Sequence, residues 1–286
     1  MDITARIERS LHTALAPGAT PPLLNLAMQH AVFPGGARVR PRLCLAAAEA
    51  CGGDDPALAE AAAAAIELMH CASLVHDDMP CFDDAATRRG RLSVHRAFGE
   101  PLALLAGDAL IVLAFQTVLR APARHPARSA QVMRIVADSV GTPSGIVAGQ
   151  AWECETHVDV SAYHRAKTAA LFAGASMAGA AAAGGPIEDW RAVGERLGEA
   201  YQVADDIGDA ISAAEEMGKP VGRDAALGRP SAVRELGLRG AVARLEALAD
   251  AAAAAVPPCR GRAALGALIR EGARRLLPKT LPAGAL

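Results

Sequence analysis

Long apolar stretches, separated by short polar or Gly/Pro-rich breaks, follow one another along the whole chain. We find no alternating strand pattern of useful length and no repeat of fixed period. The predicted helices cover residues 3–15, a stretch ending near residue 32, and residues 42–50, 57–79, 92–119 (as a pair), 127–141, 161–183 and 187–213. The sequence therefore predicts an all-α fold.

The stretch 57–79 is apolar on nearly every side. A helix with this pattern belongs in the middle of a large bundle, with other helices around it. Its start is well marked, because either Asp54 or Asp55 can act as N-cap and Pro56 suits the first helical position. We expect a single large helical domain over residues 1–286.

Composition narrows the class of protein. Apolar residues make up 52% of the chain but aromatic residues only 3%, so the core consists mainly of Ala, Leu and Val, and Ala-rich chains favour tightly packed helices. The formal charge of −2 gives no electrostatic footprint for nucleic acid or an anionic membrane. The six cysteines show no CxxC spacing, which indicates buried free thiols in a reducing compartment rather than a disulfide framework.

Two segments bear on membranes and export. The longest uncharged run, Thr168 to Ile187, has the length of a membrane span but is chiefly Ala and Gly, which favours a helix buried in a bundle over a transmembrane helix. Residues 1–9 mix acids with bases and contain no apolar core, unlike a signal peptide. We expect a soluble, cytoplasmic protein with no membrane span.

A first cluster of acids follows the helix predicted over residues 57–79. Asp77, Asp78, Asp83 and Asp84 lie within eight residues, and Arg88-Arg89 comes shortly after. Acids at the end of a buried helix are costly unless a cation neutralises them. Mg²⁺ is usually held by one or two carboxylates and the phosphate oxygens of a substrate, which arginines also bind. The alternative for this segment alone is a solvated acidic helix end balanced by two arginines.

A second cluster ends the apolar stretch 187–213. Asp205 and Asp209 are four residues apart and share one helix face, and Asp206 is three residues from Asp209. Like charges stacked this way destabilise a helix unless a cation joins them. Lysine occurs only at positions 167, 219 and 279, and Lys219 lies in a Gly-rich loop suited to closing over a phosphate.

Two such clusters, each at the end of an apolar helix, indicate more than either one alone. In a helical bundle their carboxylates can project into one central cavity walled by Ala, Leu, Val and Met. The turn Gly35-Gly36-Ala37-Arg38-Val39-Arg40 adds a possible anion site at a helix N-terminus, although it could equally be an ordinary turn with surface arginines. The combination predicts a ligand with a diphosphate head, bridged by Mg²⁺, and a hydrocarbon tail.

From Gly35 to Arg234 the chain resembles the trans-isoprenyl diphosphate synthases, and most of all the bacterial members that make geranylgeranyl diphosphate for carotenoid or bacteriochlorophyll pathways. The first Asp-rich motif of that family, in its form with a four-residue spacer, matches residues 77–83, and the second matches residues 205–209. The resemblance implies an isoprenoid-synthase bundle and a homodimer. It also implies Mg²⁺-dependent, head-to-tail condensation of isopentenyl diphosphate with an allylic diphosphate.

The resemblance also assigns roles to single residues. It implies two or three Mg²⁺ ions. Their ligands would be Asp77, Asp83 and Asp205, with Asp78, Asp206 and Asp209 completing the two motifs. The allylic diphosphate would be bound by Arg88, Lys167, Gln202 and Lys219, and Lys167 and Lys219 also count among the catalytic residues. Isopentenyl diphosphate would be bound by Arg40, His70 and Arg89.

Two departures from the family pattern concern phosphate contacts. Where the family has a lysine that binds isopentenyl diphosphate, this chain has Ala37. The missing charge-assisted contact is worth about 1.5–3 kcal/mol, so either Arg38 or another base compensates or the second substrate binds weakly. The Lys-Thr-Gly of the family reads Lys167-Thr168-Ala169 here, which we take as minor.

Product length should depend on the residues just before the first motif. Ala72 stands five residues before Asp77, next to Ser73, and Met69 lies one turn earlier. In the family, small residues at these positions leave room for a C20 chain, whereas a bulky aromatic favours C15. Ala72 could also be an ordinary core residue of an Ala-rich helix.

Three other functions remain open from the sequence. One is a farnesyl diphosphate (C15) synthase. The second is a class I terpene cyclase, whose second metal motif usually has a different composition and wider spacing. The third is a non-catalytic regulatory subunit of a prenyl synthase, which would typically have lost motif acids that this chain keeps.

Overall fold

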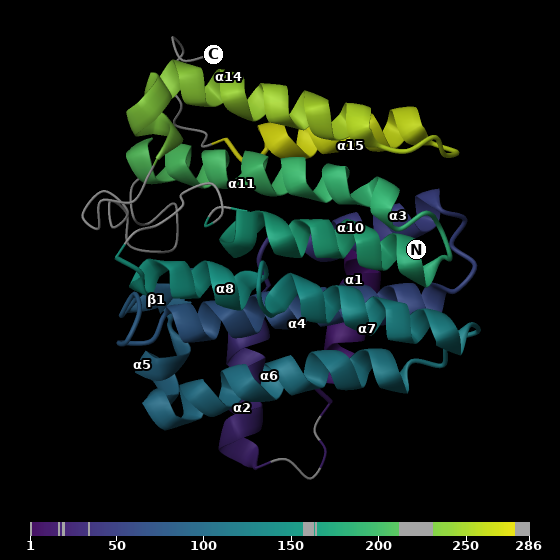
Figure 1. Ribbon diagram of the computed structural model, residues 1–286. Helices are drawn as coiled ribbons and strands as arrows, with labels where there is room; N and C mark the ends of the chain where they lie inside the picture. The colour runs from purple at the N-terminus through teal and green to yellow at the C-terminus, as the bar shows by residue number, and fades with distance from the viewer. Residues whose placement is uncertain are drawn as a thin grey trace. The chain divides into compact units, whose positions relative to one another are not determined.

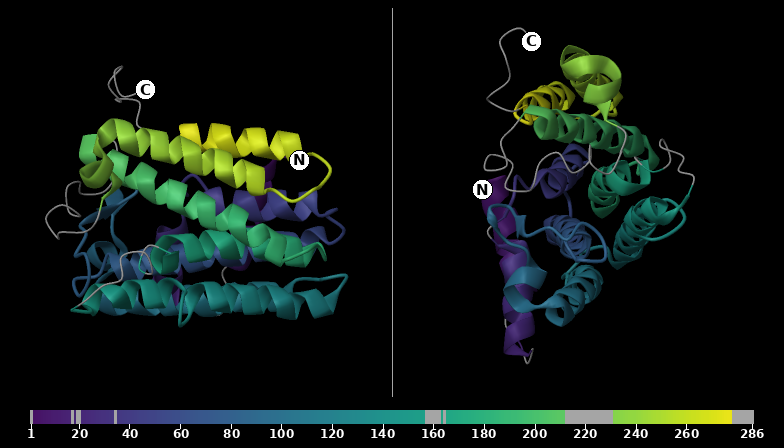
Figure 2. Two further views of the ribbon diagram at one scale, coloured as in Figure 1. Left: turned by 45° about the horizontal axis from the view of Figure 1, so that its top comes forward. Right: turned by 90° about the vertical axis from the view of Figure 1, so that its left-hand side faces the viewer.

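A computed structural model describes residues 2–16, 18, 21–33, 35–156, 163, 165–211 and 231–277 of the chain (Figure 1; Figure 2). These residues are mostly helical, and their strands are confined to β1 (Thr87–Arg88) and β2 (Arg91–Leu92), which pair antiparallel. The all-α prediction is confirmed.

Up to residue 211 most helices follow the predicted stretches, whereas the helices over residues 146–151, 232–255 and 262–274 were not predicted. They are α1 (Ile3–Ala14), α2 (Pro22–Val32), α3 (Val39–Ala50), α4 (Pro56–Asp77), α5 (Val94–Phe98), α6 (Glu100–Arg120), α7 (Pro126–Val140), α8 (Ile146–Ala151), the 3₁₀ turn η1 (Trp152–Cys154), the π-helical turn η2 (Arg165–Ala169), α10 (Ala170–Ala182), the 3₁₀ turn η3 (Glu188–Trp190), α11 (Arg191–Ile211), α14 (Ala232–Ala255) and α15 (Arg262–Arg274). Two helix starts differ from the prediction by three residues or more. Helix α11 begins at Arg191 rather than near residue 187, after the 3₁₀ turn η3. Helix α3 begins three residues before the expected Arg42, because a proline in the first turn of a helix, here Pro41, is tolerated.

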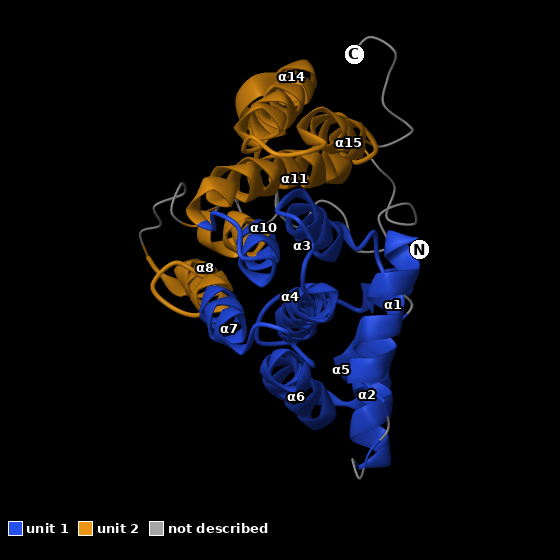
Figure 3. Cartoon of the chain, turned by 90° about the vertical axis from the view of Figure 1, so that its right-hand side faces the viewer, with its two compact units in different colours: residues 1–137, 175–187 blue, residues 138–174, 188–286 orange. Residues whose placement is uncertain are grey.

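The chain divides into two compact units, each made of two segments (Figure 3). Unit 1 contains Met1–Ala137 and Ala175–Ile187, and unit 2 contains Asp138–Gly174 and Glu188–Leu286. The prediction of a single domain over residues 1–286 stays a prediction, and each unit is described by itself below.

Helix α4 is the centre of unit 1. It packs against α1, α2, α3 and α6, and Figure 3 shows it in the middle of these helices. Of the two predicted candidates, Asp55 is its N-cap, with Oδ1 accepting a hydrogen bond from the backbone N of Leu58 at 3.2 Å, and Pro56 is its first residue, as predicted. The apolar pattern of this helix is therefore explained by burial on nearly every side, and its C-terminus delivers Asp77.

Within the part of the chain that the structure describes, two helices are long and apolar enough to cross a membrane, judged by length and composition alone. They are α4, whose most apolar window is 78% buried, and α6, whose window is 39% buried. Helix α4 is thus the core helix of unit 1, whereas α6 keeps a row of exposed apolar side chains. The uncharged run at residues 168–187 contains α10, whose residues from 171 to 182 are all buried, as predicted for a helix in a bundle.

In unit 2, α11 lies along α14, and α15 packs against α14 (Figure 1; Figure 2). Buried apolar residues on facing sides of α11 and α14 form the core between them. On α11, Gly194 and Gly198 let the helix approach the chain at Ala173 and Ala169 closely. A Cβ atom on either glycine would lie 2.4 Å and 2.5 Å, respectively, from the Cα atoms of those alanines. These contacts set the position of η2 relative to α11.

Candidate active site

The first acid cluster is shaped by a backbone turn at the end of α4. Asp77 is the last helical residue, and the chain then folds back on itself. The backbone N of Asp83 donates to the carbonyl O of Asp77 at 2.9 Å, and the backbone N of Ala85 donates to the carbonyl O of Asp78 at 3.1 Å. These bonds satisfy carbonyls at the helix end, and they bring Asp83 beside Asp77 although six residues separate them in sequence.

Asp78 binds Arg88. The Asp78 side chain is 3% exposed, and its carboxylate accepts hydrogen bonds from Nε of Arg88 at 3.0 Å and from Nη2. Burial raises the pKa of the Asp78 carboxyl, and the guanidinium group of Arg88 offsets part of this effect. The pair fixes the orientation of Arg88, because a planar guanidinium that binds a carboxylate in this way has little rotational freedom.

A tight hairpin presents the next arginine. Arg89 and Gly90, between β1 and β2, have φ angles of 53° and 73°. Two successive positive φ angles identify a type I′ turn, in which a non-glycine residue at the first position is strained. Strain of this kind at Arg89 is consistent with a functional requirement for its position.

The glycine pair at the start of α3 makes room for two guanidinium groups. A Cβ atom on Gly35 would lie 2.5 Å from Cζ of Arg38, and one on Gly36 would lie 3.1 Å from Nε of Arg89. Neither glycine has a positive φ, so close approach is the reason for both. The sequence marked this turn as a possible anion site, and the structure places Arg89 directly over it.

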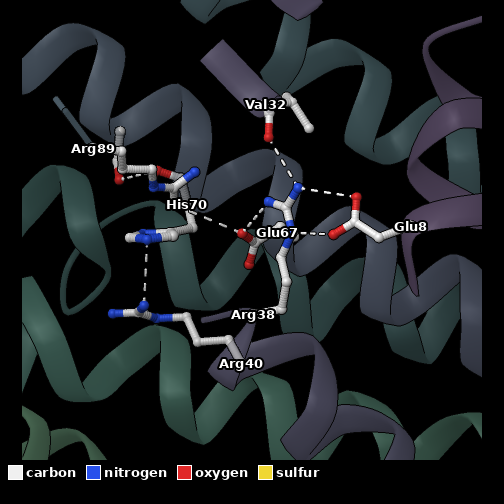
Figure 4. Close-up of polar contacts among 8 residues, drawn as sticks. Glu8, Val32, Arg38, Arg40, Glu67, His70 and Arg89 are labelled. Atoms are coloured by element: carbon white, nitrogen blue, oxygen red, sulfur yellow. Dashed lines mark hydrogen bonds and ion pairs between the residues drawn. The ribbon is translucent and has the colours of Figure 1, made fainter. Parts of the chain in front are cut away.

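Arg38 points into unit 1 and binds two acids there (Figure 4). It is 3% exposed, and its donors bind Glu8 at 2.8 Å, Glu67 at 2.7 Å and the carbonyl O of Val32 at 2.9 Å. Burial alone would lower the pKa of Arg38, but the two carboxylates raise it above its usual range. Because these partners occupy Arg38, we do not expect it to replace the lysine contact that is missing at Ala37.

His70 lies between the guanidinium groups of Arg40 and Arg89 (Figure 4). Its Nε2 is 3.5 Å from Nη1 of Arg40. Burial, together with Arg40, Arg89 and neighbouring arginines, holds the pKa of His70 well below its usual range. A neutral His70 has one ring nitrogen that accepts, so this nitrogen faces Arg40, and the group remains strongly cationic without protonation of the histidine.

In unit 2 the second acid cluster lies in the last two turns of α11. Asp206 is 6% exposed and is engaged on both oxygens. Its Oδ1 accepts from Nε2 of Gln202 at 3.0 Å, and its Oδ2 accepts from the backbone N of Ala232, the first residue of α14, at 2.8 Å. Asp206 therefore caps a helix that begins 26 residues later in the chain, while Asp205 and Asp209 are only partly buried.

Lys167 forms part of a second polar group in unit 2. Its Nζ donates to Oε1 of Glu153, which also accepts from Oη of Tyr163 at 2.7 Å, and Gln150 donates to Oε2 of Glu153 at 3.2 Å. The neighbouring Thr168 donates through Oγ1 to Oε1 of Gln202 at 2.9 Å. These bonds link η2 to η1 and to α11, and they link η1 to α8.

The structure shows where the predicted chain-length residues lie, but not what they do. Met69 and Ala72 are 2% and 1% exposed within α4, and Ser73 donates through Oγ to the carbonyl O of His70 at 2.8 Å. Their proposed part in setting chain length stays a prediction. Lys219 lies outside the described residues.

Sequence reasoning missed three acids that position the predicted basic residues, namely Glu8, Glu67 and Glu153. For Glu67 a signal existed, because a single acid deep in an apolar helical stretch needs a cationic partner. For Glu8 the polar face of a surface helix gave no such signal.

The donor set suits Mg²⁺. Asp77 and Asp83 lie side by side in unit 1, and Asp205 and Asp209 share a face of α11 in unit 2, so the ligands on offer are carboxylate oxygens, which hard cations prefer. Among the described residues, no group of three or more His, Cys, Asp or Glu side chains could hold a metal ion. One or two carboxylates completed by phosphate oxygens and water is the usual Mg²⁺ environment in phosphate-binding sites, so these residues fit the ion.

Known proteins resemble the chain over nearly its whole length. The Polyprenyl synthetase family matches residues 21–255. A geranylgeranyl diphosphate synthase from Cereibacter sphaeroides is 51% identical, with 99% of both chains covered, and one from Rhodobacter capsulatus is 47% identical, with 100% of this chain and 99% of the relative covered. A geranyltransferase from Helicobacter pylori, solved in complex with magnesium and isoprenyl diphosphate, is 28% identical with a TM-score of 0.78, covering 96% of this chain and 94% of its own.

Proposed function

Because this chain belongs to the polyprenyl synthetase family, we propose that it condenses isopentenyl diphosphate with allylic diphosphates, head to tail, and that its main product is geranylgeranyl diphosphate. The observation that carries the proposal is the grouping of acids and arginines in unit 1: Asp77 and Asp83 side by side, Arg88 held by Asp78, and Arg40 and Arg89 on either side of His70. Carboxylates for a metal ion and two separate arginine groups are what a reaction between two diphosphates needs.

In this proposal Asp77, Asp83 and Asp205 bind the Mg²⁺ ions. Bound Mg²⁺ supplies Lewis acidity, which draws negative charge onto a diphosphate leaving group. Asp78 acts through Arg88, whose guanidinium group it fixes for the allylic diphosphate. Asp206 holds Gln202 and the start of α14 in place, so its contribution is to position the second motif.

Lys167 and Gln202 bind the allylic diphosphate in the same proposal, together with Lys219. Glu153 keeps the ammonium group of Lys167 in a fixed place, and Thr168 does the same for the amide of Gln202. Preorganised cations cost no reorganisation when charge develops on the leaving group, which is where such residues contribute most to rate.

The second diphosphate is that of isopentenyl diphosphate, bound by Arg40, Arg89 and neutral His70. This group offers two guanidinium forks, which match phosphate geometry. With Ala37 exposed and Arg38 buried, the turn contributes one cation fewer than the family pattern. We therefore propose that this substrate binds more weakly here than in relatives that keep the lysine.

The protein also acts as a homodimer in this proposal, through the exposed face of α6. Leu105, Val112 and Leu119 are 51%, 54% and 63% exposed and recur every seven residues, so they form one apolar stripe along the helix. A stripe of this kind is explained by packing against a second copy. We place the enzyme in the cytoplasm, with no segment crossing a membrane.

The reaction class is tested with farnesyl diphosphate and Mg²⁺, with and without isopentenyl diphosphate. We expect a C20 diphosphate only when both substrates are present. Release of a hydrocarbon from farnesyl or geranylgeranyl diphosphate alone would favour a terpene cyclase, and no product unless a second synthase is added would favour a regulatory subunit. Omission of Mg²⁺ serves as the control, because the proposed diphosphate site depends on the ion.

A further inference from the structure

In unit 1 the buried acid Glu67 lies near two arginines, Arg38 and Arg89, that differ in how fully other residues bind them. Glu67 is 2% exposed, and its Oε1 lies 2.7 Å from Nη1 of Arg38 and 3.9 Å from Nη2 of Arg89. A carboxylate buried to this extent needs a cation close by, because an unpaired charge in the interior is strongly destabilising. Arg38 meets that need directly, and Arg89 stands at the limit of an ion pair (Figure 4).

Arg38 is held where it is by more than Glu67. Glu8 of α1 binds its Nε at 2.8 Å, and the carbonyl O of Val32 accepts from its Nη2 at 2.9 Å. Gly35 leaves the space that its guanidinium fills. Glu8 lies outside the segment 21–255 that matches the family, so this support comes from a part of the chain beyond the family match.

Arg89 makes fewer side-chain hydrogen bonds than Arg38. Its side chain is 22% exposed, and its Nη1 is buried without a hydrogen-bond partner among the described residues. Its guanidinium group lies over Gly36 and beside His70. A donor in this condition is suited to a ligand that brings its own acceptors, as a diphosphate does.

We propose that Arg38 is a positioning residue for the second diphosphate: it neutralises Glu67, with Glu8 holding it in place, and so leaves the guanidinium group of Arg89 available to isopentenyl diphosphate. This inference rests on the proposed function for the identity of the anion. If Arg38 is removed, Glu67 has to draw Arg89 into its place, and the substrate loses a contact although Arg89 is still present.

A double-mutant cycle on Arg38 and Arg89 tests the proposal, with isopentenyl diphosphate binding to the full chain measured by calorimetry. We expect Arg89→Met to weaken binding by tenfold or more in the wild-type background, but by less than threefold in an Arg38→Met background, where Glu67 already holds Arg89. If Arg89→Met costs the same factor in both backgrounds, the proposal is wrong. A general loss of positive potential would give that additive result, so the cycle separates the two explanations.

Glu67→Gln should restore isopentenyl diphosphate binding to the Arg38→Met variant. Added to Arg38→Met, it removes the acid that captures Arg89, so we expect the double variant to bind isopentenyl diphosphate within about threefold of wild type. A double variant as weak as Arg38→Met, or weaker, would mean that Arg38 serves only the fold. This comparison also decides the matter if Arg38→Met alone does not fold, because replacing both partners of a buried ion pair is far better tolerated than replacing one.

The allylic substrate supplies the internal control. Binding of geranyl diphosphate with Mg²⁺ should change by less than twofold in all these variants, whereas a loosened fold would weaken both substrates. Failure of the proposed function would look different. In that case the wild type would form no prenyl product with any starter. If the wild type does form product but the effects of Arg38→Met and Arg89→Met on binding are additive, only the proposed role of Arg38 is wrong.

Discussion

At position 37 we expect a small, exposed residue to limit the affinity for isopentenyl diphosphate. The backbone of Ala37 lies between Gly36, over which Arg89 packs, and Arg38, which is turned inward. We expect Ala37→Lys to lower KM for isopentenyl diphosphate by about tenfold, since one charge-assisted contact is worth about 1.5–3 kcal/mol. KM for the allylic substrate should stay the same. The measurement is steady-state kinetics with each substrate varied in turn, and Ala37→Gln is the control that adds length without charge.

His70 should make stability depend on pH in a defined direction. Burial and the arginines at positions 38, 40, 88 and 89 hold its pKa below the usual range, so the folded chain leaves it neutral. In the unfolded chain it takes up a proton below about pH 6.5. Stability from this residue is therefore full above about pH 6.5 and falls as pH drops below it, by up to about 1.4 kcal/mol per pH unit.

Replacing His70 with Asn removes this titration. We expect the free energy of unfolding, measured in urea between pH 7.5 and pH 5.5, to fall less steeply in His70→Asn than in wild type. Equal slopes would show that His70 is not held neutral in the fold.

At the scale of elements, α4 is both the core helix of unit 1 and the helix that ends in the first Asp-rich motif. Its apolar sides are buried against four other helices, and its C-terminal turn carries the first motif. If the growing chain runs along this helix, the residues one or two turns before Asp77 limit its length. We expect Ala72→Phe to shift the main product from C20 to C15, as read from chromatography of the dephosphorylated products.

Ala61→Phe is the matched control for that substitution. Ala61 is also buried in α4 but lies 16 residues before Asp77, about 24 Å along the helix. Both variants should lose about 1–3 kcal/mol of stability through overpacking. Only Ala72→Phe should change product length, and an unchanged length in it would remove Ala72 from the pocket floor.

Comparing the predicted elements with the observed ones shows which features of the fold the sequence alone could predict. Periodicity and breaks located most helices up to residue 211, limited the N-cap of α4 to Asp54 or Asp55, and identified both acid motifs, because these are local signals. The type I′ turn at Arg89 is local but was missed, because its first central residue is Arg rather than the Asn, Asp or Gly typical of that turn. The inward orientation of Arg38 was not predictable, since it depends on Glu8 and Glu67, which are about 30 residues away in the sequence. Asp206 illustrates the limit, because its motif indicated metal binding while its hydrogen bonds also cap α14.

At the scale of the whole molecule, the all-helical isoprenoid synthase fold agrees with the solved relatives. The exposed stripe on α6 makes a prediction about assembly. We expect Leu105→Glu with Val112→Glu to convert a dimer into a folded monomer in sedimentation experiments, because both side chains are exposed on the single chain and are not part of its core. Leu268→Glu on α15, a residue that is 63% exposed, should leave the sedimentation unchanged. A wild-type monomer would contradict the proposed assembly.

The most direct test of the account is to size the products made from labelled isopentenyl diphosphate. Purified protein with Mg²⁺ is given C5, C10 or C15 allylic diphosphate in turn, with Asp77→Asn as the inactive control. We predict that the starters which react give a C20 diphosphate as the longest main product, and that Asp77→Asn loses at least a thousandfold in rate, or about 4 kcal/mol of transition-state stabilisation. Absence of a prenyl product from all three starters would contradict the proposed function.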